Sequence, residues 1–316
     1  MNENENKPLP PAENPFQAPV DASLVDAQQQ PVVSNVRPVP VRVWSAITVP
    51  FIGIITSLIV ATIALFAAIF ALGININPND MGSLFEELFD HPLGIWVVVL
   101  PGQLGFLAAG VIAAMLSPVP TGKRLRMGIG KLPIWTWFVF LVATPCIGLV
   151  TALVIQLMDI APSEHLKMME QMMTAKNGLA FLVLTFLIAI VPGFVEELLF
   201  RGYMQARLLM KWPPIAAILL SSFVFAIAHV DPLHACAVFP IGIWFGLVAY
   251  RAGSIWPAVL CHFGNNFLSL TLSQFGFETI GFGATELAIF VPCTLAMLFS
   301  LFLLSKGTSD ARVKTR

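Results

Sequence analysis

Long apolar runs separated by short polar breaks dominate the chain from Trp44 onward. Each run is close to the ~20 residues that a helix needs to cross roughly 30 Å of hydrocarbon. The pattern predicts eight membrane-spanning helices, at residues 44–72, 94–117, 134–158, 179–200, 214–230, 236–251, 254–273 and 285–305. We therefore expect an all-α fold, a polytopic transmembrane helix bundle.

Residues 1–42 have a different composition, with many Pro, Asn, Gln, Glu and Ala. Such a segment cannot bury enough apolar surface to offset the entropy lost on ordering, so we expect a disordered, Pro-rich N-terminal tail. The segment lacks a basic region followed by a short apolar core, and a cleaved signal peptide is therefore not expected.

Lysine and arginine predict the orientation, because short cytoplasmic loops carry an excess of both. If both termini are cytoplasmic, only Lys167 and Lys176 of the 17 basic residues fall outside. The others are Lys7, Arg37, Arg42, Lys123, Arg124, Arg126, Lys131, Arg201, Arg207, Lys211, Arg251, Lys306, Arg312, Lys314 and Arg316. We expect a multi-pass integral membrane protein with both termini in the cytoplasm.

The outer loop at residues 162–176 carries Leu166, Met169 and Met173 at helical spacing. One interpretation is an amphipathic helix that lies on the outer membrane surface. The other is a loop helix whose apolar face is partly buried in the protein. The sequence leaves both open.

Composition supports the membrane assignment and excludes other classes. Hydrophobic residues make up 57% of the 316 residues and charged residues 11%, against roughly 45–50% and about 25% in soluble domains. The net charge of -1 gives no support for nucleic-acid binding. Four cysteines lie in apolar stretches without the paired spacing of zinc or redox sites: Cys146, Cys236, Cys261 and Cys293.

Charged residues within the fourth apolar run indicate a functional site, because charges inside a membrane are costly and usually functional. Glu197 and Arg201 are four residues apart with the acid first, which favours an ion pair on a helix. Glu196 projects about 100° away on the helical wheel, so it remains available as a base. The alternative is that both glutamates only lie at the inner water interface with Arg201.

Two further helices carry polar pairs at a spacing of four residues. Phe225 and His229 share one face of the fifth segment, and His262 and Asn266 share one face of the seventh. A single histidine in an apolar helix is more often structural than catalytic. Three such helices in one chain favour a common site.

Spacing places Glu196 and His229 at the same height. They are equally distant from the Trp212–Pro213 break, which has the composition of a helical-hairpin turn. His262 lies only about eight residues into the seventh span, whereas His229 is close to the end of the fifth, so their heights match only if the hairpin turn projects well into the cytoplasm.

In this order, Glu196-Glu197 with Arg201, Phe225 with His229, and His262 with Asn266 resemble the motifs of the CPBP family of intramembrane proteases. This family includes the type II CAAX prenyl endopeptidases and the ABI group of bacteriocin-processing or immunity proteins. The resemblance covers about residues 179–273 and divides the chain around a catalytic core at 179–273. The tail at 1–42 and three helices at 43–178 precede it, and the last helix with a basic tail, 274–316, follows.

The resemblance implies a role for each motif residue. Glu196 with His229 would activate the attacking water, His262 and Asn266 would stabilise the oxyanion, and Glu197 with Arg201 would be a structural pair. The implied activity is hydrolysis of a peptide bond in a membrane-associated peptide or protein.

Metal dependence stays open at this point. The family is commonly called a metalloprotease group, and Glu196, His229 and His262 could complete a zinc site with one open position. A metal-free mechanism driven by the glutamate uses the same residues, and we favour it slightly. His91, His165 and His234 lie in predicted outer loops and receive no role.

Two other functions compete with proteolysis. In a non-catalytic binding or immunity-type scaffold of the same family, these residues would have no catalytic role. A chain that had lost catalysis could lose any one of them, whereas all four candidate catalytic residues are present here. A transporter would use a buried Glu-Arg-His network as a proton relay. The absence of an internal repeat and of a second acidic helix makes the transporter the weaker alternative.

Overall fold

The computed structural model describes residues 43–74, 81–91, 93–175, 177–275 and 284–306. The predicted tail at 1–42 lies outside them. Within these ranges the regular structure is entirely helical. The elements are α2 (Trp44–Leu72), α3 (Met81–Asp90), α4 (Gly94–Met115), α5 (Thr121–Arg124), α6 (Ile134–Leu157), α7 (Glu164–Met172), α8 (Gly178–Leu184), η1 (Thr185–Ile190), α9 (Val191–Glu197), η2 (Leu198–Gln205), α10 (Ala206–Leu208), α11 (Pro214–Ile227), α12 (Pro232–Ala252), α13 (Trp256–Gln274) and α14 (Ala284–Lys306).

All eight predicted segments are helices, which confirms the all-α membrane fold. Among the described residues, five helices are long and apolar enough to span a membrane by length and composition: α2, α4, α6, the continuous run Gly178–Leu208, and α12. α11 is shorter, with 14 residues. α13 has 19 residues but carries His262, Asn265 and Asn266, which lower its mean hydropathy.

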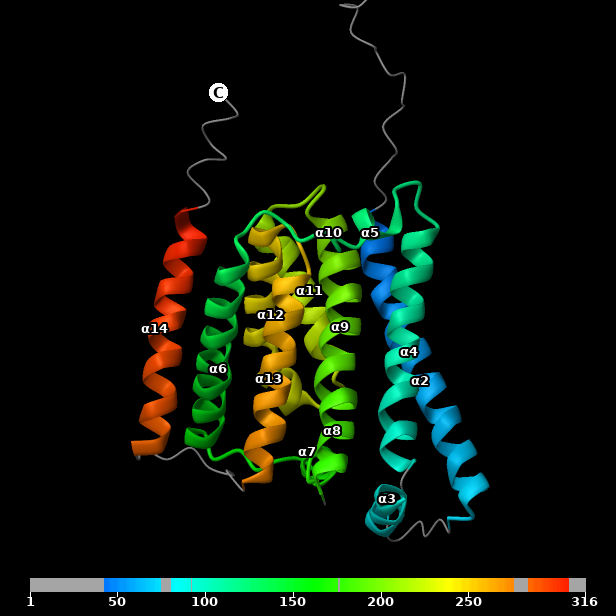
Figure 1. The fold of residues 1–316 in the computed structure, drawn as a ribbon. Helices are drawn as coiled ribbons and strands as arrows, with labels where there is room; N and C mark the ends of the chain where they lie inside the picture. Colours follow the sequence, from blue (N-terminus) through cyan, green and yellow to red (C-terminus); the bar gives the residue numbers. More distant parts are fainter. Residues whose placement is uncertain (1–42, 75–80, 92, 176, 276–283, 307–316) are drawn as a thin grey trace, which may run out of the picture. The chain divides into compact units, whose positions relative to one another are not determined.

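Neighbouring helices pack in an order that differs from the chain order. α2 lies against α4, and α6 lies against α14 (Figure 1). Between these two pairs the run from α8 to α10 contacts α13, α4 and α11, while α12 contacts α11, α13 and α6. Of the motif helices, α9 and α13 therefore pack against each other, and α11 packs against η2 and α12.

Outward-facing surfaces are apolar, as lipid contact requires. On α2, Ile55, Ile63 and Phe70 expose 56%, 63% and 90% of their surface. The buried interior contains polar side chains instead, among them Glu197 and Arg201 at 0% and 1% exposure. Exposing such apolar faces to water would cost about 25 cal/mol per Å², so these faces fit a bilayer.

Several helix ends follow from local sequence. Ser163 accepts a hydrogen bond from Leu166 N–H at the start of α7, and Asn177 accepts one from Ala180 N–H at the start of α8. Gly253 ends α12 in the left-handed conformation, with φ of 66°. These caps fix where the helices around the interior begin and end.

Candidate active site

The run Gly178–Leu208 is one continuous helix with two wider turns of π-helical type, η1 and η2. They flank α9, which carries both glutamates. Pro192 in the first turn of α9 has no N–H to donate to the Ile188 carbonyl four residues earlier. π-type turns frequently occur at functional sites, and here they replace the uninterrupted α-helix that the sequence predicts.

Glu197 is the centre of a buried charge network. Its Oε1 accepts a hydrogen bond from Arg201 Nη1 at 3.0 Å and one from His262 Nδ1, also at 3.0 Å. Both ionic side chains, Glu197 and Arg201, are fully buried. Glu197 and Arg201, which the sequence predicts to pair, are in contact, and Glu197 additionally contacts His262.

Arg201 links the first two motifs. Its Nη2 donates to the Gly242 carbonyl at 2.9 Å, and its guanidinium carbon lies 4.3 Å from the centre of the Phe225 ring. A cation over an aromatic face is attracted by the ring's quadrupole. Phe225 also contacts the rings of His229 and His262, with centroid distances of 5.0 and 5.8 Å.

Glu196 points away from Arg201, as the helical wheel predicts. Its Oε1 accepts a hydrogen bond from Gln103 Nε2 of α4 at 2.9 Å. Its Oε2 has no hydrogen-bond partner among the described residues and lies 3.9 Å from His262 Nε2. One carboxylate oxygen is thus held in place, and the other is left for a water molecule or substrate.

His229 follows α11 in a tight connection to α12. Its Nδ1 lies 3.0 Å from the Phe225 carbonyl, which only accepts, so Nδ1 carries the proton. Val230 adopts a φ of 66°, a left-handed conformation that costs a β-branched residue about 1–3 kcal/mol. Asp231 then caps α12 by accepting from His234 N–H at 2.8 Å. This strained turn fixes the direction of the imidazole.

Asn266 is held on both sides of its amide. Its Nδ2 donates to the Ile188 carbonyl at 3.0 Å. Pro192 has no N–H with which to donate to this carbonyl. Its Oδ1 accepts from Asn265 Nδ2 at 3.3 Å. Because an amide nitrogen carries two hydrogens, one N–H of Asn266 stays available for another acceptor.

A cavity of about 340 Å³ brings the four predicted catalytic residues together. Glu196, His229, His262 and Asn266 all line it. The remaining lining residues come from α4, α7, η1, α9, α11, α12 and α13: Val99, Leu166, Met169, Met172, Met173, Ile188, Pro192, Phe225, His234, Val238, Ile241, Phe245, Asn265 and Ser269. This size falls within the range of about 300–1,000 Å³ for small-molecule sites.

Glu196 and His262 lie at the same height in the bundle, with 3.9 Å between Glu196 Oε2 and His262 Nε2. A Cβ on Gly202 would lie 2.7 Å from the Leu125 carbonyl and 3.4 Å from Ile255, so Gly202 is level with the turn before α13. The helix continues to Leu208, about 9 Å further at 1.5 Å per residue. The hairpin therefore extends beyond the start of α13, and Glu196 reaches the height of His262.

The possible metal ligands are Glu196, His229 and His262. No group of three His, Cys, Asp or Glu side chains within the described ranges could hold a metal ion. Glu196, His229 and His262 share a cavity, and Nδ1 of each histidine is held, by the Phe225 carbonyl and by Glu197, which leaves Nε2 as the ring nitrogen available to another partner.

Sequence reasoning missed several residues at this site. Gln103 is the one amide side chain in its apolar run, which is the signal that could have identified it. Asn265 lines the cavity beside Asn266. His234, to which no role was given, also lines the cavity, and its ring centre lies 4.7 Å from that of His229. His91 Nδ1 accepts from Leu93 N–H outside this site, and the side chain of His165 lies outside the described part.

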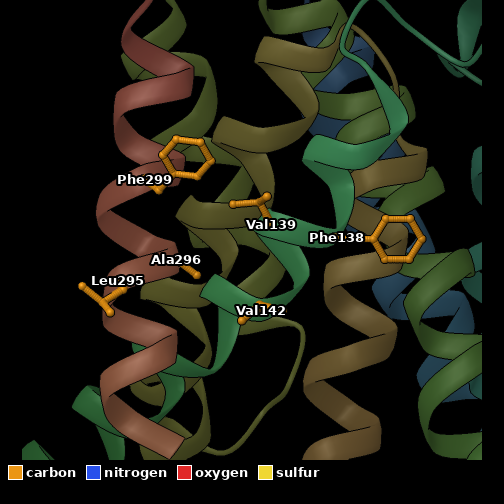
Figure 2. A pocket seen from close by; sticks show the side chains of 6 residues that line it. All are labelled: Phe138, Val139, Val142, Leu295, Ala296 and Phe299. Carbon is orange, nitrogen blue, oxygen red and sulfur yellow. The ribbon is translucent and has the colours of Figure 1, made fainter.

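A second hollow of about 420 Å³ lies between α6 and α14 (Figure 2). Only apolar side chains line it: Phe138, Val139, Val142, Leu295, Ala296 and Phe299. It contains no group that could carry out acid-base chemistry. Of these two cavities, the one around Glu196 is lined by groups that can carry out acid-base chemistry.

Fold and site together define a helical membrane protein with a Glu-His-Asn site inside its bundle. Residues 178–268 match the family model of the type II CAAX prenyl endopeptidases, described as Rce1-like. The match contains every motif residue and confirms the family resemblance predicted from the three motifs.

One curated relative is similar over a longer stretch. It is the "Putative membrane peptidase YdiL" of Bacillus subtilis (strain 168), 24% identical over 186 residues, which cover 57% of this chain and 72% of the relative. No solved structure matches the chain. At the family level, these matches support a membrane protease.

Proposed function

We propose that this protein is an intramembrane endopeptidase that hydrolyses a peptide bond of a membrane-associated peptide or protein. One observation carries the proposal. Glu196, His229, His262 and Asn266, which come from three segments of the chain, line a single cavity. All four lie in the region that matches the protease family.

Glu196 is the proposed general base. Gln103 holds Oε1, so Oε2 accepts a proton from a water molecule in the cavity. His229 assists, because its Nδ1–H is directed to the Phe225 carbonyl and the lone pair on Nε2 accepts from the same water. The resulting hydroxide attacks the carbonyl carbon of the substrate peptide bond.

His262 and Asn266 are the proposed donors to the oxyanion. Asn266 contributes its remaining amide N–H, and the bonds to Ile188 and Asn265 orient it beforehand. Glu197 holds His262 through Nδ1, and His262 donates to the oxyanion from Nε2. The tetrahedral intermediate then breaks its C–N bond, and the proton taken up from water passes to the leaving amine.

The proposal is metal-free, since Glu196 and the two histidines supply the base and donor functions themselves. A chelator should therefore leave the hydrolysis rate unchanged. The substrate is proposed to be associated with the membrane because the cavity lies among helices with apolar outer faces.

The test is cleavage of a panel of lipidated peptides and leader peptides by the purified full-length protein, with and without chelator. The wild type should cleave at least one peptide, and Glu196→Gln should not. Glu87→Gln on α3, an exposed carboxylate, is the matched control and should cleave normally. Cleavage retained by Glu196→Gln would contradict the proposal and favour the non-catalytic scaffold of the same family.

A further inference from the structure

α7 is an amphipathic helix between α6 and α8, and its two faces have different surroundings. Its apolar face, with Leu166, Met169 and Met172, lines the site cavity together with Met173 just after the helix. The opposite face is exposed and polar, with Glu164, Lys167, Glu170 and Gln171. Of the two interpretations of this segment, the partly buried loop helix is the one observed, and what it faces is the candidate active site.

The end of α7 is fastened to the helix that carries His262 and Asn266. Ala175 N–H donates to Gln274 Oε1 at 2.9 Å, and Gln274 Nε2 donates to the Met173 carbonyl. Gln274 is the last residue of α13. α7 therefore lies at the end of the bundle where α6 ends and α8 begins (Figure 1), as one wall of the cavity.

The cavity has two chemically different sides. Glu196, His262 and Asn266 supply polar groups on the α9 and α13 side, and methionines supply the α7 side. Methionine is unbranched and polarizable, so it adapts to apolar groups of different shapes. A polar side chain placed against this wall would lose its hydration without gaining a hydrogen bond, which costs about 1–3 kcal/mol in proteins.

We propose that α7 selects the substrate: its methionine face binds a large apolar side chain that flanks the scissile peptide bond. The inference rests on the proposed function for the position of that bond. It commits to one occupant, an apolar residue of a peptide, because the methionine wall and the proposed base line one continuous cavity.

Photo-crosslinking tests the wall independently of catalysis. The probe is a leucine- and alanine-rich peptide with one benzoylphenylalanine, irradiated with full-length Glu196→Gln protein in lipid nanodiscs and mapped by mass spectrometry. Adducts are expected on Met169, Met172 or Met173. An unlabelled peptide with leucine at the probe position should compete, and its glutamine analogue should not.

Adducts confined to lipid-facing positions, such as Phe138 and Leu295 of the second hollow (Figure 2), would overturn the inference. So would equal competition by the leucine and glutamine peptides. Adducts on α7 without any cleavage by the wild type would leave the wall in place and remove the protease. Cleavage by the wild type together with adducts elsewhere would leave the protease in place and overturn the methionine wall.

Specificity measurements add a second test. For a peptide that the wild type cleaves, the flanking residue is changed from leucine to glutamine and kcat/KM is measured for both. The wild type should prefer leucine, and the double variant Met169→Gln/Met172→Gln should reduce this preference about tenfold, mainly through KM. Glu170→Gln, on the exposed face of the same helix, should keep the wild-type preference. An unchanged preference in the double variant would contradict the proposal.

Discussion

Glu196 and Glu197 are adjacent in the chain and both lie near His262, but their hydrogen-bond donors differ. Glu197 is enclosed by Arg201 and His262, which both donate to its Oε1. Glu196 receives a neutral amide N–H from Gln103 at Oε1, and its Oε2, 3.9 Å from His262 Nε2, has no hydrogen-bond partner in the part of the chain that the structure describes. Glu197, which pairs with the charged Arg201, therefore fits a structural carboxylate. Glu196, whose donor is the neutral Gln103, fits a reactive one.

This difference predicts unequal stability losses for two isosteric substitutions. Glu197→Gln leaves the buried guanidinium of Arg201 without its counter-charge, and removing one partner of a buried pair costs about 3–5 kcal/mol. Glu196→Gln keeps an acceptor for Gln103 and should change stability little. Thermal unfolding in detergent should give a clearly lower Tm for Glu197→Gln, and equal losses would show that the two carboxylates are not divided in this way.

Gln103 is expected to position Glu196 for the reaction. Gln103→Met preserves the shape of the side chain and removes the donor to Oε1. We expect kcat to fall about tenfold, because even a small displacement of a catalytic group lowers the reaction rate strongly. KM and Tm should stay near the wild-type values. A loss of Tm with unchanged kcat would instead assign Gln103 a purely structural role between α4 and α9.

Much of the site could be predicted from residue spacing, but only where the interaction is local. The pairing of Glu197 with Arg201 is an i,i+4 contact, which helix geometry fixes. The bond from His262 to Glu197 and that from Gln103 to Glu196 join residues 65 and 93 positions apart. Such contacts depend on how helices pack, and a single sequence does not contain that information.

At the element level, the eight apolar runs correctly predict eight helical segments, and their boundaries shift for local reasons. α11 ends at Ile227 because the turn at Val230 follows, and α12 begins at Pro232 because Asp231 caps it. The short helices α3 and α5 were not predicted, since neither has an apolar run of membrane length. The π-type turns around α9 were not predicted, because hydropathy does not indicate which backbone groups of a helix are hydrogen-bonded to each other.

α2 and α4 approach closely through small residues, as is common between membrane helices. A Cβ on Gly105 would lie 2.6 Å from Ser57 Cα, which belongs to the backbone and cannot move aside alone. Gly105→Ala should therefore lower stability by about 1–3 kcal/mol through overpacking, seen as a lower Tm in detergent.

Gly148→Ala on α6 is the matched control. Its Cβ would have no neighbour closer than 3.6 Å, an ordinary contact distance. Both substitutions gain the same helix propensity, so a comparable Tm for the two variants would show that the α2–α4 contact is looser than described.

For the whole molecule, the distribution of basic residues predicts one orientation in the membrane. The start of α2 and the end of α14 lie at the same end of the bundle (Figure 1), which agrees with an even number of crossings. We predict that tags on both termini are protected in right-side-out vesicles and accessible in inverted ones. A terminus that is accessible from the outside would contradict the orientation that the fifteen-to-two partition of basic residues predicts.

The central claim is that Glu196 and His229 act together on one water molecule. The most direct measurement is the hydrolysis rate of the wild type, Glu196→Gln, His229→Ala and the double variant on one cleaved peptide. Groups that serve the same step are strongly non-additive, so each single variant should abolish turnover and the double variant should be hardly slower than either. Near-normal cleavage by Glu196→Gln, or losses that simply multiply in the double variant, would contradict the account.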